Sequence, residues 1–146
     1  MKLLRIEPRV VEYIPDQLAA GVLYISDRFR VCSHLCCCGC REEVVTPLSE
    51  AEWKLTRQGA LVSLWPSVGN WDYACQSHYI IERNQVRWAP QLSCRDIARV
   101  KQRDRLDLQR MIANQLPVSG QAGPPAQSHW SRAKAYIRVF LDRIFK

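Results

Sequence analysis

The fold of this chain depends on the segment His34-Leu35-Cys36-Cys37-Cys38-Gly39-Cys40 and on its counterpart Cys75-Gln76-Ser77-His78. Together the two segments hold five of the seven cysteines and two of the three histidines. Free cysteines usually behave as small buried hydrophobes, and such residues scatter along a chain. Four thiols within five positions therefore indicate a metal site, which we expect the second segment to complete from a distant strand.

Zinc is the metal that these residues favour, because it takes four ligands in a tetrahedron and thiolates suit it. The expected ligands are Cys36, Cys38, Cys40 and Cys75. The first three alternate, so an extended segment would point them to one side, and Gly39 allows the chain to tighten around a metal. His34 or His78 remains an alternative ligand, since Cys75-x-x-His78 also has ligand-like spacing. The alternative without a metal is a reduced, cysteine-rich buried turn.

The composition predicts a globular protein with a reduced interior. The 146 residues are one domain's worth of chain, with 47% hydrophobic and 24% charged residues. No stretch approaches the ~18 apolar residues of a membrane helix, and the charged N-terminus lacks the apolar core of a signal peptide. We therefore expect a cytoplasmic protein without a membrane partner, where cysteine clusters favour metal over disulfides. An odd number of cysteines also fits poorly with full pairing.

The pattern of apolar residues predicts an α+β fold. It consists of a small, mainly antiparallel β domain organised around the zinc site, followed by two C-terminal helices. Strand patterns occupy residues 21–26, 43–48, 53–57, 60–65, 78–82 and 85–89. Arg83-Asn84 has the length of a two-residue hairpin turn, and Pro66–Trp71 has the composition of a loop.

After Pro90 the period becomes helical. Ser93 is the expected cap of a first helix, with Asp96 as its partner, and a second helix is expected to begin at Ser128. We thus expect a zinc-bearing β domain over residues 1–91 and a basic helical extension over residues 92–146 that packs on it.

The charge is distributed unevenly between these two parts. Residues 1–91 hold 10 Lys or Arg and 10 Asp or Glu, whereas residues 92–146 hold 11 and 4, so the whole net charge of +7 lies in the extension. A basic block can bind nucleic acid, an acidic protein or an anionic surface, although a solvated helix face has the same composition. Because the extension lacks a recognisable reader motif, nucleic-acid binding is the least favoured function.

A second candidate site is catalytic. Acyl transfer needs a nucleophile, a base within hydrogen-bond reach and donors for an oxyanion. His78 is the best base and Ser67 the best nucleophile, because Ser67 lies in a turn that offers backbone N–H groups around Gly69. His34 is expected to assist or orient.

Other residues remain alternatives for these roles. Ser63 and Ser77 are alternative nucleophiles, Asp72 is a possible third member of a triad, and the Asn70 side chain is a possible oxyanion donor. Turns rich in Ser, Pro, Gly and Asn are common without catalysis, so these residues alone leave the choice open.

Several motifs occur together in a family that the chain resembles. They are Gly21-Val-Leu-Tyr, His34-x-Cys36-x-Cys38-Gly39-Cys40, Val44-Val-Thr-Pro-Leu48, Ser63-Leu-x-Pro-Ser67-Val-Gly-Asn-Trp71, Cys75-x-Ser77-His78-Tyr79-x-Ile81 and Val86-x-Trp88-Ala89. With these motifs, over residues 20–90, the sequence resembles small bacterial domains of unknown function whose genes accompany ubiquitin-like proteins and their activating and conjugating enzymes. One departure is Cys37, where relatives more often have Ala or Pro.

The resemblance implies a four-cysteine metal centre and a role in ubiquitin-like conjugation. It also implies a peptidase activity that processes or removes the ubiquitin-like protein, with that protein and its activating or conjugating enzymes as partners. We therefore expect a zinc-stabilised serine-type peptidase or esterase, in which four thiolates make the zinc structural. The alternative is a noncatalytic zinc-binding adaptor of the same pathway.

Overall fold

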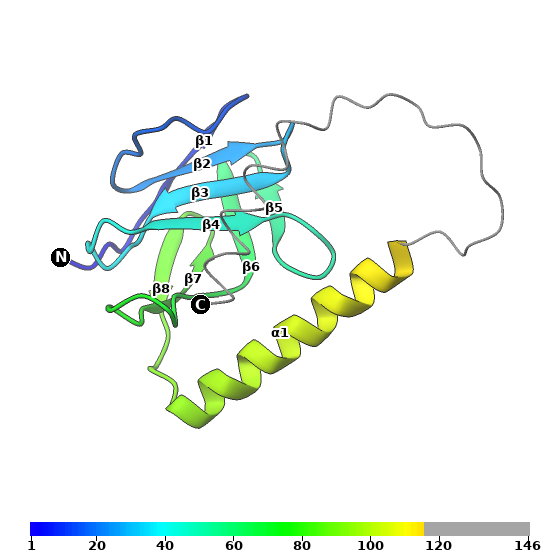
Figure 1. Cartoon of the computed structure of the whole chain (residues 1–146). Coiled ribbons are helices and arrows are strands. Elements are labelled where there is room, and N and C mark those ends of the chain that lie inside the picture. Colours follow the sequence, from blue (N-terminus) through cyan, green and yellow to red (C-terminus); the bar gives the residue numbers. More distant parts are fainter. Residues whose placement is uncertain (116–146) are drawn as a thin grey trace, which may run out of the picture. The chain divides into compact units, whose positions relative to one another are not determined.

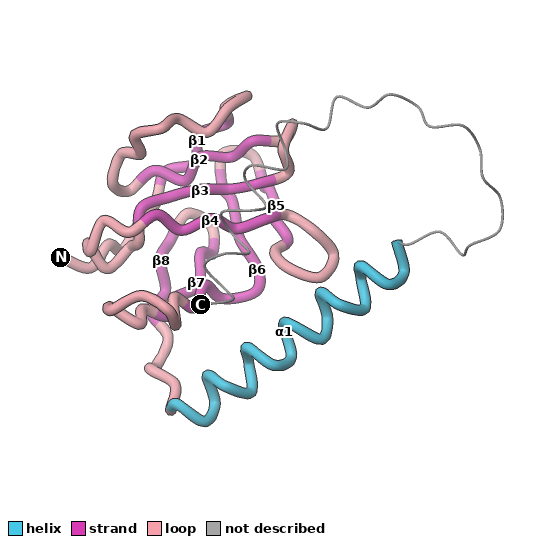
Figure 2. Tube along the Cα trace, in the orientation of Figure 1, coloured by secondary structure: helices cyan, strands magenta, loops and turns pink. Residues whose placement is uncertain are grey.

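A computed structural model describes residues 1–115. Within this range the elements are β1 (Glu7–Val10), β2 (Val22–Ser26), β3 (Val31–Leu35), β4 (Glu43–Pro47), β5 (Lys54–Gln58), β6 (Leu61–Gly69), β7 (His78–Glu82), β8 (Gln85–Trp88) and α1 (Cys94–Gln115). Figure 2 shows the strands in magenta and the helix in cyan, and the helix follows all the strands in the sequence. The second expected helix, from Ser128, lies outside the described residues. No helix within residues 1–115 has the length and apolar character needed to cross a membrane.

The strands form two four-stranded sheets, in the orders β1-β2-β3-β4 and β5-β6-β7-β8. β1 is parallel to β2, and the other neighbours pair in antiparallel fashion. Isolated bridges join the two sheets at both edges, from Arg5 to Gln85 and from Leu48 to Trp53. The α+β class with mainly antiparallel sheets is therefore confirmed, with one helix in the part of the chain that the structure describes.

The core lies between the sheets, whose strands run across one another in Figure 1. Alternate residues of β6 and β7 point inward, and Leu64, Tyr79 and Ile81 are almost fully buried. Burying a side chain of this size contributes roughly 1.5–3 kcal/mol. Cys36 and Cys37 belong to the same buried cluster, so the cysteine segment is anchored in the core.

The sequence pattern correctly predicted most of the sheet formed by β5, β6, β7 and β8. Arg83 and Asn84 both have positive φ, 49° and 64°, which is the backbone of a tight two-residue hairpin turn. The expected loop over Pro66–Trp71 is wrong, because β6 continues to Gly69. Pairing of the end of β6 with β7 overrides the turn composition, and a register shift between Leu64 and Val68 accommodates the proline, which has no N–H to donate.

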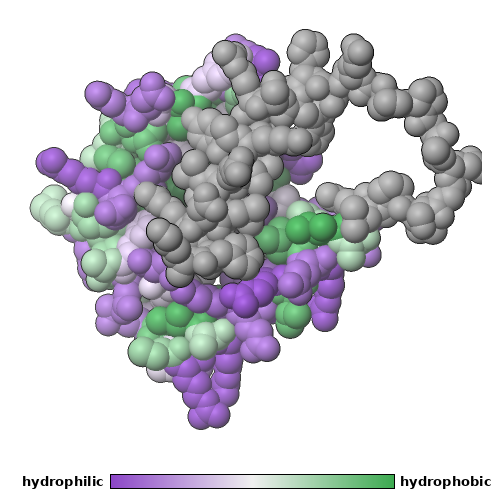
Figure 3. Space-filling model, in the orientation of Figure 1, coloured by the Kyte–Doolittle hydropathy of each residue, from purple (hydrophilic) through white to green (hydrophobic). Residues whose placement is uncertain are grey.

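Helix α1 begins as the sequence predicted. The Asp96 backbone N–H donates to Ser93 Oγ over 3.2 Å, which satisfies one of the free donors of the first turn. An ion pair between Lys101 and Asp72 connects the helix to the segment before β7. Hydrophilic side chains cover much of the visible surface in Figure 3, with hydrophobic ones among them.

Candidate active site and metal cluster

Four cysteine sulfurs meet between the end of β3 and the start of β7. The Sγ atoms of Cys36, Cys38, Cys40 and Cys75 all lie within 4.8 Å of one another. Cys36 Sγ is 3.4 Å from Cys38 Sγ and 3.9 Å from Cys75 Sγ, and the Cys40 and Cys75 sulfurs are 3.8 Å apart. Four thiols at such distances can hold a metal ion.

Two tight turns bring these sulfurs together. In the first, the Gly39 N–H donates to the Cys36 carbonyl over 3.0 Å, and Gly39 has a φ of 89°. A Cβ at Gly39 would also lie 3.1 Å from the Met1 nitrogen, so the turn requires glycine. In the second, the Gln76 N–H donates to the Tyr73 carbonyl over 3.0 Å, and this turn carries Cys75.

The environment of Cys75 favours its thiolate form. Burial alone would raise the pKa of this thiol, but hydrogen bonds from the side chain and backbone of Ser77, and from Cys38 and Cys40, outweigh burial and lower the pKa to about 7. Because the thiolate is the form that binds metals, Cys75 is prepared for that role near neutral pH.

The three remaining cysteines lie outside the cluster. Cys37 and Cys32 are fully buried, and burial raises the pKa of each thiol to about 12. Cys94 is exposed at the first residue of α1. Cys37 therefore remains a neutral core thiol although two cluster members flank it.

His34 occupies the core. Its Nε2 lies 2.8 Å from the Tyr79 hydroxyl, and its buried Nδ1 has no partner within residues 1–115. Burial lowers the pKa of His34 to about 4, so the ring is neutral at pH 7. Among the described residues, no hydrogen bond joins His34 to Ser67 or His78, and neither histidine belongs to the sulfur cluster.

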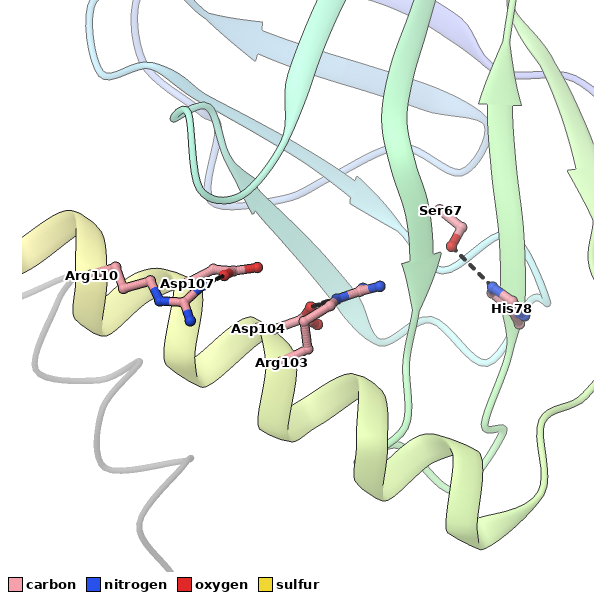
Figure 4. Close-up of polar contacts among 6 residues, drawn as sticks. All are labelled: Ser67, His78, Arg103, Asp104, Asp107 and Arg110. Atoms are coloured by element: carbon pink, nitrogen blue, oxygen red, sulfur yellow. Dashed lines mark hydrogen bonds and ion pairs between the residues drawn. The ribbon is translucent and has the colours of Figure 1, made fainter.

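Ser67 and His78 point toward each other from the neighbouring strands β6 and β7, as Figure 4 shows. Ser67 Oγ lies 3.0 Å from His78 Nε2. The pairing of Gly69 with His78 fixes the two strand ends against each other. Both side chains are partly buried, so they remain within reach of a substrate.

The other nitrogen of His78 determines what the ring can do. Nδ1 lies 3.0 Å from the Pro90 carbonyl oxygen. A carbonyl can only accept a hydrogen bond, so Nδ1 carries the proton and Nε2 presents a lone pair. In that tautomer Nε2 can accept the Ser67 hydroxyl proton, as a general base does.

The group that orients His78 is thus a backbone carbonyl, which no sequence pattern reveals. Asp72, a possible third member of the triad from the sequence, forms the ion pair with Lys101. Ser63 Oγ accepts the Arg83 N–H over 3.0 Å, away from the imidazole. The fold therefore brings Ser67, and neither alternative serine, into contact with the His78 ring nitrogen.

Asn70, a possible oxyanion donor by its residue type, directs its donor groups to other partners. Its backbone N–H donates to the Ser77 carbonyl over 2.9 Å, and its side-chain Nδ2 donates to Ser77 Oγ over 2.8 Å. Nδ2 also lies 3.4 Å from Cys36 Sγ. Both donor groups of Asn70 are directed toward Ser77 and the sulfur cluster.

The Trp71 indole packs against the His78 ring, with the ring centroids 4.9 Å apart. Gly69 makes room for the indole, because a Cβ at this position would lie 2.3 Å from Trp71 Cε2.

We therefore expect Gly69→Ala to displace Trp71 and to shift the NMR signals of the His78 ring protons, which now lie beside an aromatic ring. Gly59→Ala is the matched control: its φ of 60° makes alanine strained, but nothing lies within 4 Å. Unchanged His78 signals in Gly69→Ala would contradict this packing.

One comparison with known proteins gives a match. A family model described as bacterial ubiquitination-like system serine protease (BubE) matches residues 10–89. The matched range contains Ser67, His78 and the four clustered cysteines, whereas Pro90 lies directly after it. No curated protein and no solved structure matches the chain.

Proposed function

Because the chain belongs to the bacterial ubiquitination-like system serine protease (BubE) family, we propose that it is a serine-type peptidase or esterase that processes or removes a ubiquitin-like protein. The proposed nucleophile is Ser67 and the proposed base is His78. The observation that carries the proposal is the 3.0 Å contact between Ser67 Oγ and His78 Nε2, in the tautomer that the Pro90 carbonyl selects.

The proposed reaction is acyl transfer in two steps. Ser67 Oγ attacks the carbonyl carbon at the end of the ubiquitin-like protein while His78 Nε2 takes the hydroxyl proton. His78 returns this proton to the departing amine or alcohol, which leaves an ester on Ser67. Water then attacks the ester, with His78 as base again, and releases the carboxylate and free Ser67. The Pro90 carbonyl stabilises the imidazolium that forms at each step, because Nδ1–H continues to donate to it.

We also propose that the cysteine cluster binds one structural zinc. A tetrahedron with Zn–S bonds of about 2.3 Å has edges of about 3.8 Å, and three sulfur pairs lie 3.4, 3.8 and 3.9 Å apart. Four thiolates leave no open position for a catalytic water. The metal would therefore stabilise the fold by tying the turn after β3 to the segment before β7.

The proposed setting follows from the family and from the thiols. The proposed partners are a ubiquitin-like protein and the enzymes that activate or conjugate it. Seven free cysteines favour a reducing compartment, so we propose the cytoplasm. We further propose that residues 1–91 form the zinc-bearing domain and that a basic extension begins at residue 92. The Lys101–Asp72 ion pair joins α1, the described part of this extension, to the β domain.

A serine-reactive fluorophosphonate tests the nucleophile directly. We expect the full chain to gain one adduct, which peptide mass spectrometry locates on Ser67. His78→Ala should slow labelling about 100-fold or more, because the base is lost. Zinc content, measured by elemental analysis, should stay at wild-type level in His78→Ala, since His78 lies outside the cluster.

Ser63→Ala is the control, and it should label like the wild type. An adduct on Ser63 or Ser77 would assign a different nucleophile. No adduct on any serine would favour the adaptor function, whereas zinc loss in His78→Ala would make His78 a ligand.

A further inference from the structure

We propose that Asn70 and Ser77 are positioning residues that connect the cysteine cluster to the Ser67–His78 pair. The inference rests on the proposed function for its catalytic part, because it assigns the two residues a role in that reaction. It rests on geometry for its metal part, because both side chains contact the sulfur of Cys36.

The three side chains form a closed triangle of polar contacts. Asn70 Nδ2 lies 2.8 Å from Ser77 Oγ and 3.4 Å from Cys36 Sγ, and Ser77 Oγ lies 3.1 Å from Cys36 Sγ. All three residues are buried, with exposed fractions of 8%, 6% and 1% for Asn70, Ser77 and Cys36. Buried polar contacts of this kind are strong because water does not compete for them.

The chemistry of the amide fixes the direction of the two bonds that Asn70 makes. The Asn70 amide NH2 can only donate, so Ser77 Oγ accepts from it and keeps its own proton for a neighbouring sulfur, that of Cys36 at 3.1 Å or that of Cys75. As a thiolate, Cys36 can therefore accept hydrogen bonds from the Asn70 N–H and from the Ser77 O–H. A metal-bound thiolate accepts such bonds, and these outer-shell donors orient a ligand.

The positions of Asn70 and Ser77 along the chain also connect these contacts to the Ser67–His78 pair. Asn70 follows β6 three residues after Ser67, and Ser77 immediately precedes His78. Their backbones are also joined, since the Asn70 N–H donates to the Ser77 carbonyl over 2.9 Å. The ends of β6 and β7 are thus held together next to the sulfur cluster, at the point where the 3.0 Å contact between Ser67 and His78 must be kept.

The inference is tested by two variants that change only the donors. Asn70→Asp replaces the amide donor with an acceptor that faces the sulfur, and Ser77→Ala removes the hydroxyl. In competition with a chromogenic chelator, we expect each full-length variant to hold Zn²⁺ about 10- to 100-fold more weakly than the wild type. In the Co²⁺-substituted protein, the thiolate-to-metal charge-transfer band should shift in both variants.

The catalytic part has its own readout. We expect kcat for cleavage of a C-terminal extension from a ubiquitin-like protein to fall about 10-fold or more, with KM little changed, because the reacting groups are misplaced while substrate contacts remain. Ser77→Thr keeps the hydroxyl and should restore both metal affinity and kcat. Asn84→Asp is the matched control, since Asn84 is equally buried but bonds Val62 and Ala60, far along the strands from the cluster.

Wild-type zinc affinity in both Asn70→Asp and Ser77→Ala would overturn the metal part. Weaker zinc binding with an unchanged kcat would overturn the connection between the two sites. If Asn70→Asp fails to fold, Ser77→Ala and its Ser77→Thr counterpart still decide the question. A wild-type protein that cleaves nothing would refute the proposed function, and the chelator and Co²⁺ measurements would still test the role of Asn70 and Ser77 at the metal.

Discussion

Ser67→Ala should abolish release of a ubiquitin-like protein from its C-terminal extension, with kcat/KM falling about 1,000-fold or more. The substitution removes the Ser67 hydroxyl oxygen, which lies 3.0 Å from His78 Nε2. Without this oxygen the acyl intermediate cannot form. The serine is only half-buried and little packing depends on it, so the fold and the metal content should stay unchanged. Intact mass measurements on an amide-linked and an ester-linked substrate would quantify the loss.

Two further variants sharpen this experiment. Residues that act as a unit are strongly non-additive, so the Ser67→Ala/His78→Ala double variant should be hardly slower than either single variant. Ser63→Ala is the matched control: it lies on the same strand and loses one hydrogen bond, from the Arg83 N–H, yet should retain its activity. If Ser67→Ala cleaves at the wild-type rate, Ser67 is not the nucleophile.

Cys75→Ser should lose the bound zinc and most of the stability of residues 20–90. Structural zinc contributes about 10–16 kcal/mol to small metal domains, and whole domains are stable by only about 5–15 kcal/mol. Cys75 is also the cluster member that comes from the distant segment, so its loss frees the start of β7 from the turn after β3. Elemental analysis would measure the zinc, and thermal unfolding would measure the stability.

Cys37→Ala is the control that separates metal binding from packing. Cys37 is buried between two cluster members in the sequence but lies outside the cluster, so this variant should keep one equivalent of zinc and lose only packing energy. A wild-type protein that is folded and free of metal would contradict the zinc proposal. So would a Cys75→Ser variant that keeps its zinc and its melting temperature.

Short-range signals account for what the sequence predicted well. The turn at Arg83-Asn84 and the cap at Ser93 both depend on residues within three positions of each other, and both have the expected geometry. The proximity of the four cysteines was also predictable, because three alternating thiols with one distant partner have few other uses.

Long-range pairing accounts for what the sequence concealed. Pro66 and Gly69 have the composition of a loop, and it is the pairing of Val68 with Tyr79 and of Gly69 with His78 that makes this segment a strand. Asn70 has the residue type of an oxyanion donor, but the register with β7 directs its amide to Ser77 and Cys36. In each case the neighbouring strand determines the local structure. A single sequence does not specify which residues of two strands will pair.

The Pro90 carbonyl gives the site an unusual mutational robustness. A catalytic histidine oriented by an aspartate can lose its partner through one codon change, whereas every residue type at position 90 supplies a carbonyl oxygen. The Ala89 N–H also donates to the His78 carbonyl over 2.9 Å. This bond holds the backbone just before Pro90 beside the backbone of His78. Insertions or deletions between β8 and α1, rather than point substitutions, are therefore the genetic changes that would separate His78 from its orienting group.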